Sequence, residues 1–243
     1  MASPLFSNIR TNDAGYDNVN CASYKGVTIK TFFLLAIAVI VAAMVVTYLP
    51  EILVNNFNGF YITLGVSSIV GLISVLVGRL SERLSKYFSV VYAVCEGLFL
   101  GTLTALLEES YPGIALTAIF STFIIFGVVL VLFATGIVKP TRKFRAICFA
   151  FVIGALLLTI FGFVINMIVG VTGNVGILIA VEIFLLIYGA ITLVLNFAEA
   201  QYLVDRGASK DAEWSVALGL TVSLIYIYVQ ALRFIALIAS RRK

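Results

Sequence analysis

The stretch that decides the fold runs from residue 176 to residue 235: GILIAVEIFLLIYGAITLVLNFAEAQ, then YLVDRGASKDAEW, then SVALGLTVSLIYIYVQALRFI. Two long apolar runs flank a charged hinge, and five polar residues in or beside them are candidates for function: Glu182, Asn196, Glu199, Gln230 and Arg233. Polar groups are costly at membrane depth, where they usually face a protein interior or a water-filled cavity. We therefore expect these two segments to build most of any functional centre.

Composition defines the class of protein. The 243 residues are 62% hydrophobic and 12% charged, whereas soluble domains carry about 25% charged residues. Several uncharged runs reach the length of about 18 residues that crosses a bilayer as a helix. The short alternating segments typical of a membrane β-barrel are not found in the sequence. We therefore predict an all-α polytopic membrane protein, in contact with the lipid bilayer and built as one bundle.

Several chemistries are excluded by the residues that the chain lacks. It contains no histidine, so neither an HExxH zinc site nor a nucleophile–histidine pair can form. Cys21, Cys95 and Cys148 are too few and too scattered for a disulfide framework or a metal cluster. The net charge of +4 is not gathered into the dense basic face that nucleic acids require. We expect no enzyme activity, no cofactor and no nucleic-acid partner.

Seven apolar spans are predicted between a polar cytoplasmic arm, residues 1–30, and a basic tail, residues 241–243. The spans cover residues 31–49, 59–77, 89–107, 114–138, 146–169, 176–198 and 214–240, and together they form one transmembrane domain over residues 31–240. We do not expect the arm to be a signal peptide, because its apolar segment begins late and no small-residue cleavage site follows. Order is expected in it only near residues 24–30. Pro50 is predicted to end the first span, since proline cannot continue a helix.

Loop charges predict the orientation in the membrane. With a cytoplasmic N-terminus, the basic loops at 79–86, 139–145 and 206–210 fall inside, and the loops without Lys or Arg fall outside, as the positive-inside rule requires. The basic tail breaks this pattern. Either the last segment re-enters and returns, or the other loops outweigh the tail. The segment is long enough to cross, which favours a seventh true span.

Two further features lie outside the last two spans. Gly65, Gly71 and Gly78 are interleaved with serines in the second span, a pattern that favours close helix packing over pore lining. Glu96 is a carboxyl about two turns into the third span, and we count it among the candidate functional residues. The alternative for Glu96 is an interfacial position near the cytoplasmic end, from which the side chain reaches water.

Several segments, in the same order along the chain, resemble the YccA-like branch of the Bax inhibitor-1 family. They are YAVCEGLFLGTLTALLEESYPGIALTA (92–118), TGIVKPTRKFR (135–145) and RGASKDAEWSVALGLTVSLIYIYVQALRFIA (206–236), and YKGVTIKT (24–31) fits the family's entry segment. The resemblance covers residues 24–239. It implies a bundle of seven helices in which the last helix is surrounded by the other six, and it points to a bacterial plasma membrane.

The resemblance also implies a pH-sensitive calcium leak pathway, in which two acidic side chains between the sixth and seventh helices form a proton-controlled latch. Here the family's L-D-F-D pattern reads L-N-F-A, with Asn196 in place of the first acid, and Gln230 replaces the acid of the last helix. Two carboxyls can share a proton, whereas an Asn and a Gln cannot, so the latch is weakened.

Loss of the two acids changes what the neighbouring residues are expected to do. Arg233 would lack its usual carboxylate partner nearby. Glu199, one position beyond Ala198, would partly replace the lost acid, and Glu182 would lie about four turns earlier, in the outer half of the bilayer. Any surviving proton sensitivity would reside in Glu96, Glu182 or Glu199.

Two functions from different classes remain open. The first is a passive cation pathway, with calcium as the expected ion, through the bundle around the last helix; its weakness is the loss of the carboxylates that calcium prefers. Calcium and protons are the small partners expected of it. The second is a non-conducting scaffold that binds other membrane proteins and regulates membrane-protein quality control or a stress response. Convergence of Glu96, Glu199 and Arg233 on one internal cavity favours the pathway, and dispersal to the lipid–water interfaces favours the scaffold.

Overall fold

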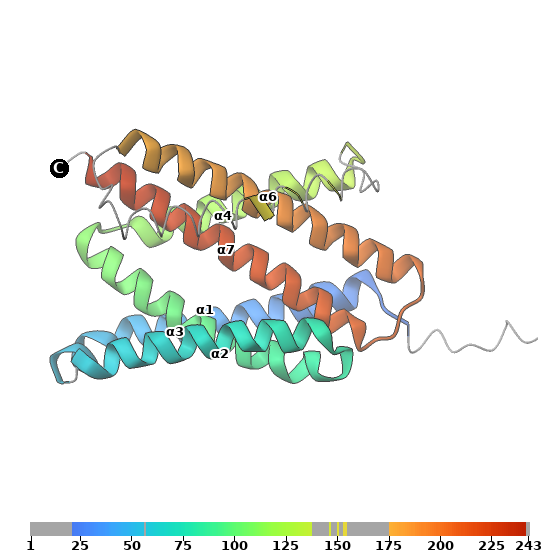
Figure 1. Cartoon of the computed structure of the whole chain (residues 1–243), viewed down its shortest axis with the longest axis horizontal. Helices are drawn as coiled ribbons and strands as arrows, with labels where there is room; N and C mark the ends of the chain where they lie inside the picture. The colour runs from blue at the N-terminus through green and yellow to red at the C-terminus, as the bar shows by residue number, and fades with distance from the viewer. Residues whose placement is uncertain are drawn as a thin grey trace, which may run out of the picture.

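The computed structural model describes residues 21–55, 57–137 and 175–241, together with positions 146, 150, 153 and 154. Six long helices are described: α1 Tyr24–Asn55, α2 Phe57–Leu80, α3 Glu82–Ser110, α4 Ile114–Ala134, α6 Val175–Asp205 and α7 Ala212–Ser240 (Figure 1). Within these residues, five helices are long and apolar enough to cross a membrane, and Leu64–Leu80 is a shorter apolar helix. The predicted class, an all-α multi-pass membrane protein, is confirmed. Apart from positions 146, 150, 153 and 154, the predicted span at 146–169 lies outside the described residues.

Helix α1 is longer than predicted at both ends. It begins at Tyr24 rather than Thr31, which confirms the order expected near residues 24–30, and it continues through Pro50 to Asn55. The prediction that Pro50 ends the helix is therefore wrong. A proline removes a single backbone hydrogen bond from a helix, and membrane helices tolerate that loss because neighbouring groups satisfy the freed carbonyl.

The hinge predicted at residues 199–213, between the last two spans, is shorter in the structure, because α6 continues to Asp205 and α7 begins at Ala212. Glu199 thus lies within α6 and not in the hinge. The helix ends where Gly207 adopts a positive φ of 62°. The Ala208 N–H donates to the Leu203 carbonyl at 3.1 Å and the Gly207 N–H to the Val204 carbonyl at 3.0 Å. This is a Schellman motif, and it explains the R-G-A sequence at this position.

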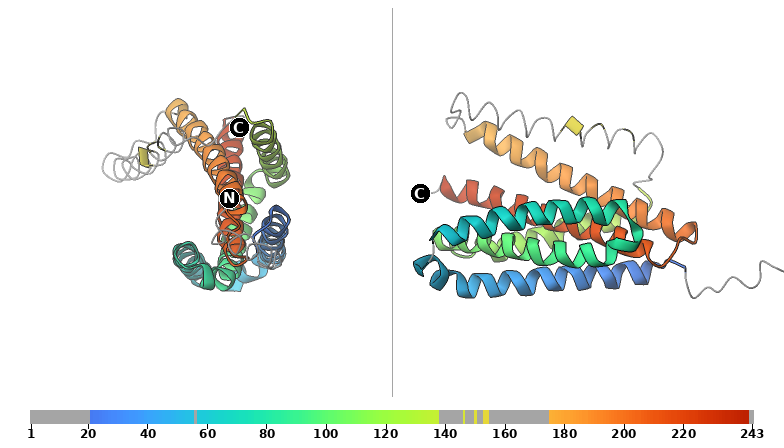
Figure 2. Two further views of the ribbon diagram at one scale, coloured as in Figure 1. Left: turned by 90° about the vertical axis from the view of Figure 1, so that its right-hand side faces the viewer. Right: turned by 60° about the horizontal axis from the view of Figure 1, so that its bottom comes forward.

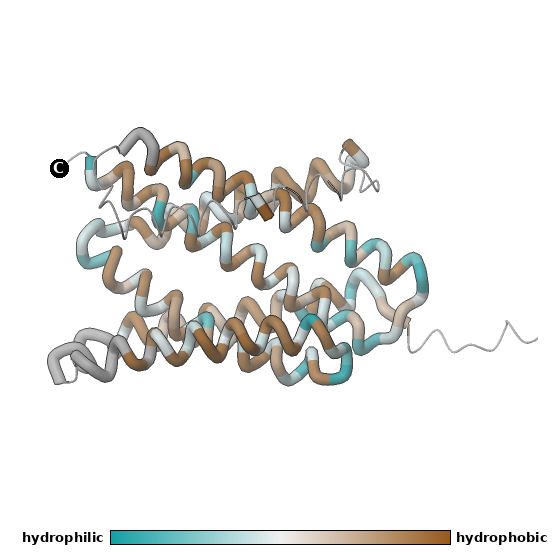
Figure 3. The backbone as a smooth tube through the Cα atoms, in the orientation of Figure 1, coloured by the Kyte–Doolittle hydropathy of each residue, from teal (hydrophilic) through white to brown (hydrophobic). Residues whose placement is uncertain are grey.

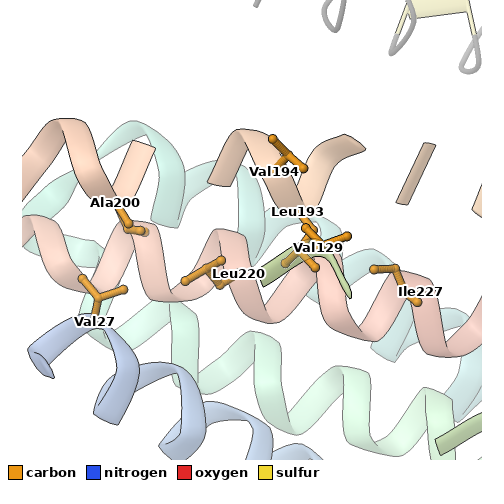
Figure 4. Packing of buried hydrophobic residues seen from close by; sticks show 8 residues of the cluster. Val27, Val129, Leu193, Val194, Ala200, Leu220 and Ile227 are labelled. Carbon is orange, nitrogen blue, oxygen red and sulfur yellow. The ribbon is translucent and has the colours of Figure 1, made fainter. Parts of the chain in front are cut away.

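Helix α7 is the centre of the described part of the bundle. It contacts each of the other five described helices, and it crosses between α6 on one side and α1, α2 and α3 on the other (Figures 1 and 2). About half of its residues are buried, and its unbroken course favours a true crossing over a re-entrant segment. One cluster of buried apolar side chains joins it to α1, α4 and α6 (Figure 4); it comprises Val27, Val129, Leu193, Val194, Ala200, Val216, Leu220 and Ile227.

Small residues allow the closest helix contacts. A Cβ atom on Gly97 would lie 2.7 Å from the Ala38 carbonyl oxygen, and one on Gly101 would lie 2.7 Å from the Ala42 carbonyl oxygen. The G-x-x-x-G spacing of α3 thus faces an A-x-x-x-A spacing of α1, the usual device for close membrane helices.

The glycines of α2 fulfil the packing prediction only in part. Gly71 packs on α3, and Gly78 packs on α3 and on Leu218 of α7. Gly65 has nothing within 4 Å of its Cβ position among the described residues, so the predicted packing is not seen at this position in the part of the chain that the structure describes. Apolar residues continue along most of each described helix, and polar residues gather near the α6–α7 turn and the α2–α3 turn (Figure 3). Most apolar side chains of α2 outside these contacts are exposed, as expected for a helix that faces lipid.

Candidate functional site

A polar cluster joins the end of α2 to α6 and α7. The Arg79 guanidinium donates through Nη1 to both oxygens of Glu199, at 2.8 and 3.1 Å, and through Nη2 to Asn196 Oδ1 at 2.7 Å. Asn196 in turn donates through Nδ2 to the Gly219 carbonyl at 3.0 Å and to Ser223 Oγ at 2.6 Å. Charged hydrogen bonds from two nitrogens of one guanidinium are stronger than neutral ones, and they also fix the orientation of the guanidinium. We refer to these five residues as the inner cluster.

Gly219 makes room for the inner cluster. A Cβ atom at this position would collide with the Arg79 guanidinium and would lie 2.6 Å from Asn196 Oδ1. Only glycine therefore permits the arginine of α2 to reach α6 across the surface of α7. The same absence of a side chain leaves the Gly219 carbonyl accessible to the Asn196 amide.

A cavity of about 240 Å³ extends from the inner cluster along the α6–α7 interface. Its lining combines apolar and polar side chains of α2, α6 and α7: Val75, Arg79, Tyr188, Thr192, Asn196, Gly219, Val222, Ser223 and Tyr226. Tyr188 and Tyr226 meet edge to face, with ring centroids 5.2 Å apart. The cavity therefore has a charged inner end and an aromatic far end.

A second ion pair lies beyond the aromatic end. Arg233 Nη2 is 3.1 Å from Glu182 Oε1, and the side chains are 52% and 9% exposed, respectively. Gln230 is buried, one turn after Tyr226 and one turn before Arg233 on the same face of α7. We refer to Glu182, Tyr226, Gln230 and Arg233 as the outer cluster.

The prediction that Arg233 lacks a carboxylate partner is wrong, and helix register explains why. Asn196 contacts Gly219, and α6 and α7 run antiparallel. Glu182 precedes Asn196 by 14 residues and Arg233 follows Gly219 by 14. Fourteen residues are close to four helical turns, so equal offsets in opposite chain directions bring the two side chains together.

The polar residues of both helices form one continuous stripe. On α7 they recur at steps of four and three: Gly219, Ser223, Tyr226, Gln230 and Arg233. Steps of this size keep side chains on one helix face. On α6 the facing residues are Glu182, Tyr188, Thr192, Asn196 and Glu199. The stripe connects the inner cluster, the cavity and the outer cluster.

Glu96 lies apart from this stripe. Its carboxylate is close to Gly71, in the interface between α2 and α3, next to Cys95 and Tyr92. It is half-buried and lies 14 residues from the start of α3 at Glu82, so it is not at the helix end. Glu96, Glu199 and Arg233 thus occupy three separate places and do not converge on one cavity.

The structure also brings together polar residues that the sequence did not single out. Glu213, only 1% exposed, accepts hydrogen bonds from Ser23 N at 2.8 Å, from Ser23 Oγ at 3.3 Å and from Lys30 Nζ at 2.7 Å. Lys30 also lies 5.0 Å from the centre of the Trp214 ring and donates to the Lys210 carbonyl. We call this group the clamp, because it ties the start of α1 to the start of α7.

Arg79 was likewise missed as a site residue, since its position in a basic loop assigned it to topology alone. The signal that was available is its place at the end of an apolar helix, where a long side chain can turn back along the helix. The described residues contain no group of three or more His, Cys, Asp or Glu side chains that could hold a metal ion.

The fold and the stripe define a multi-pass membrane protein whose last helix carries buried polar groups against its neighbour. The family model described as Bax inhibitor 1 like matches residues 3–240, and the chain belongs to this family. Members of the family are generally non-enzymatic membrane proteins. Comparisons with curated proteins and with solved structures gave no significant match.

Proposed function

We propose that the polar stripe between α6 and α7 is a passive leak pathway for cations, with calcium as the first ion to test. The observation that carries this proposal is the continuity of polar side chains from the inner cluster, through a cavity of about 240 Å³, to the outer cluster. Polar groups at membrane depth are rare and usually line such routes. Packing alone would not require ten positions in register on two facing helices.

The inner cluster accounts for a closed state. The Arg79 guanidinium occupies the inner end of the cavity, and its charge repels any cation that approaches within a few ångströms. Glu199 and Asn196 hold it there through three hydrogen bonds. Because Asn196 carries no charge, the latch depends on Glu199 for its ionic component, and pH dependence of the leak is expected to be weak.

The alternative is a non-conducting scaffold that contacts other membrane proteins and affects membrane-protein quality control. The separate positions of Glu96, Glu199 and Arg233 favour it, as does the lack of three gathered metal ligands among the described residues. In that case the stripe would serve only to hold α6 and α7 together by interhelical hydrogen bonds. Conduction distinguishes the two functions.

The proposed topology completes this model of the protein. Seven spans with a cytoplasmic N-terminus place the clamp and the inner cluster at the cytoplasmic side, and the outer cluster near the opposite surface. Arg233 follows Ala212 by 21 residues, which corresponds to about 30 Å along a helix, the thickness of the hydrocarbon core. We place this protein in the plasma membrane of a bacterial cell.

The test is calcium flux into proteoliposomes that contain the purified chain, at pH 6 and at pH 8. We expect a small flux for the wild type and a severalfold larger flux for Arg79→Gln, because the variant removes the positive charge from the cavity. Arg83→Gln is the matched control, since Arg83 is an exposed arginine four residues further along. If folded wild type and Arg79→Gln both conduct no better than empty vesicles, the scaffold replaces the pathway.

A further inference from the structure

The outer cluster contains two buried oxygen atoms without partners. Glu182 Oε2 and Gln230 Oε1 accept no hydrogen bond from any described residue, although Glu182 and Gln230 are only 7% and 5% exposed. Buried polar atoms in native proteins are nearly always paired, so each exception requires an explanation. The other oxygen of Glu182 forms the ion pair with Arg233.

Both unpartnered atoms are acceptors, which restricts what can satisfy them. A carboxylate oxygen and an amide oxygen need a hydrogen-bond donor or a cation. Tyr226 supplies a hydroxyl one turn before Gln230, on the same face of α7 as Gln230 and Arg233. Oxygen ligands of these three kinds suit small hard cations rather than thiophilic metals.

Arg233 is poorly buried for a residue that neutralises a buried carboxylate. Its side chain is 52% exposed, against 9% for Glu182, and its Nη2 lies 3.1 Å from Glu182 Oε1. An exposed arginine at the edge of a membrane can turn its head group to water while its stem stays on the helix. Arg233 is thus a tethered cation that can leave the site.

We propose that the outer cluster is a binding site for a small hard cation, Ca²⁺ being the probe, and that Arg233 competes with that cation for Glu182. The ligands are the two Glu182 oxygens, Gln230 Oε1, the Tyr226 hydroxyl and water. With a single carboxylate the site is weak, with an expected Kd of about 1 mM for Ca²⁺. Its role as the outer end of a pathway rests on the proposed function, but binding itself does not.

The test is a titration of the full-length protein in lipid nanodiscs with Tb³⁺, read as luminescence excited through tyrosine, followed by displacement with Ca²⁺. We expect the Kd for Ca²⁺ to fall about tenfold in Arg233→Gln, because the competing charge is removed. We expect the site to be lost in the Arg233→Gln/Glu182→Gln double variant. Arg83→Gln, at an exposed position outside both clusters, is the matched control and should leave the Kd unchanged.

Equal Ca²⁺ affinity in the wild type and in Arg233→Gln overturns the proposal, as does unchanged binding in Arg233→Gln/Glu182→Gln. Thermal unfolding in the same nanodiscs provides a second readout: Ca²⁺ should raise the Tm of Arg233→Gln and leave the Tm of the double variant unchanged. A double variant that does not fold would still leave the gain of affinity in Arg233→Gln as a decisive measurement. Binding without flux would refute the pathway alone, and flux without binding would refute the cation site alone.

Discussion

Two buried carboxylates of this protein differ in how completely their oxygen atoms are paired with neighbouring groups. Glu213, at the start of α7, accepts three hydrogen bonds from Ser23 and Lys30, and both of its oxygens are engaged. Glu182, on α6, has one oxygen on an exposed arginine and the other without a partner among the described residues. The two side chains are similarly buried, so burial alone does not distinguish them.

The difference separates a structural polar contact from one that is available for binding. A buried hydrogen-bond network in which every polar atom is paired makes the fold rigid. A network that is only partly paired still has acceptor or donor atoms that a ligand can bind. In the clamp, Ser23 also accepts a hydrogen bond from the Gly26 N–H and so acts as the N-cap of α1. The clamp is therefore complete, and the outer cluster is not.

The largest expected loss of stability comes from a substitution in the clamp. In Glu213→Gln, an amide replaces one acceptor oxygen and leaves the Lys30 ammonium, whose side chain is 15% exposed, without a countercharge. Breaking a buried ion pair by removing one partner costs about 3–5 kcal/mol of unfolding free energy. Denaturant unfolding in mixed micelles measures the loss. Glu109→Gln, at an exposed position near the end of α3, is the control and should change stability little.

A smaller loss of unfolding free energy is expected from a substitution that adds a methyl group to the clamp and leaves its charges unchanged. A Cβ atom at Gly26 would collide with the Glu213 carboxylate, so Gly26→Ala should destabilise the protein by about 1–3 kcal/mol, the usual range for overpacking. Gly65→Ala is the matched control, since nothing lies within 4 Å of that Cβ position among the described residues. Alanine in a helix is favoured over glycine by about 0.5–1 kcal/mol, so the control should be neutral or stabilising. Equal effects at both glycines would mean that the clamp is loosely packed.

Much of the architecture follows from the sequence because it depends on local pattern. Uninterrupted apolar runs predict each described helix, but the predicted end of the sixth span at residue 198 falls seven residues short of the end of α6 at Asp205. The glycine of R-G-A, Gly207, marks the observed end. The extension of α1 past Pro50 was not predictable from helix propensity, because the surroundings of a membrane helix decide whether a proline ends it or only bends it.

The site was predictable as a set of positions but not as a set of pairs. Asn196, Glu199, Gln230, Arg233 and Glu182 stand out as polar residues within apolar runs, and all five do lie along the α6–α7 stripe. Their partners come from far along the chain: Arg79 is 120 residues from Glu199, and Ser23 is 190 residues from Glu213. Pattern along one helix carries no information on contacts at such separations. Helix register gives the Glu182–Arg233 pair only after one antiparallel contact is known.

The smallest effect on stability is expected at Glu182. Glu182→Gln removes an ion pair to a half-exposed arginine, worth about 0–1 kcal/mol, and it also removes a charge that is expensive to keep buried. These terms oppose each other, so the unfolding free energy should change by less than about 1 kcal/mol in the same micelles that report the loss in Glu213→Gln. If the two substitutions prove equally destabilising, Glu182 stabilises the fold as Glu213 does, and the unpaired Oε2 atom of Glu182 is then no evidence for a bound ligand. If Glu182→Gln is neutral, the carboxylate is kept at this position for a reason other than folding.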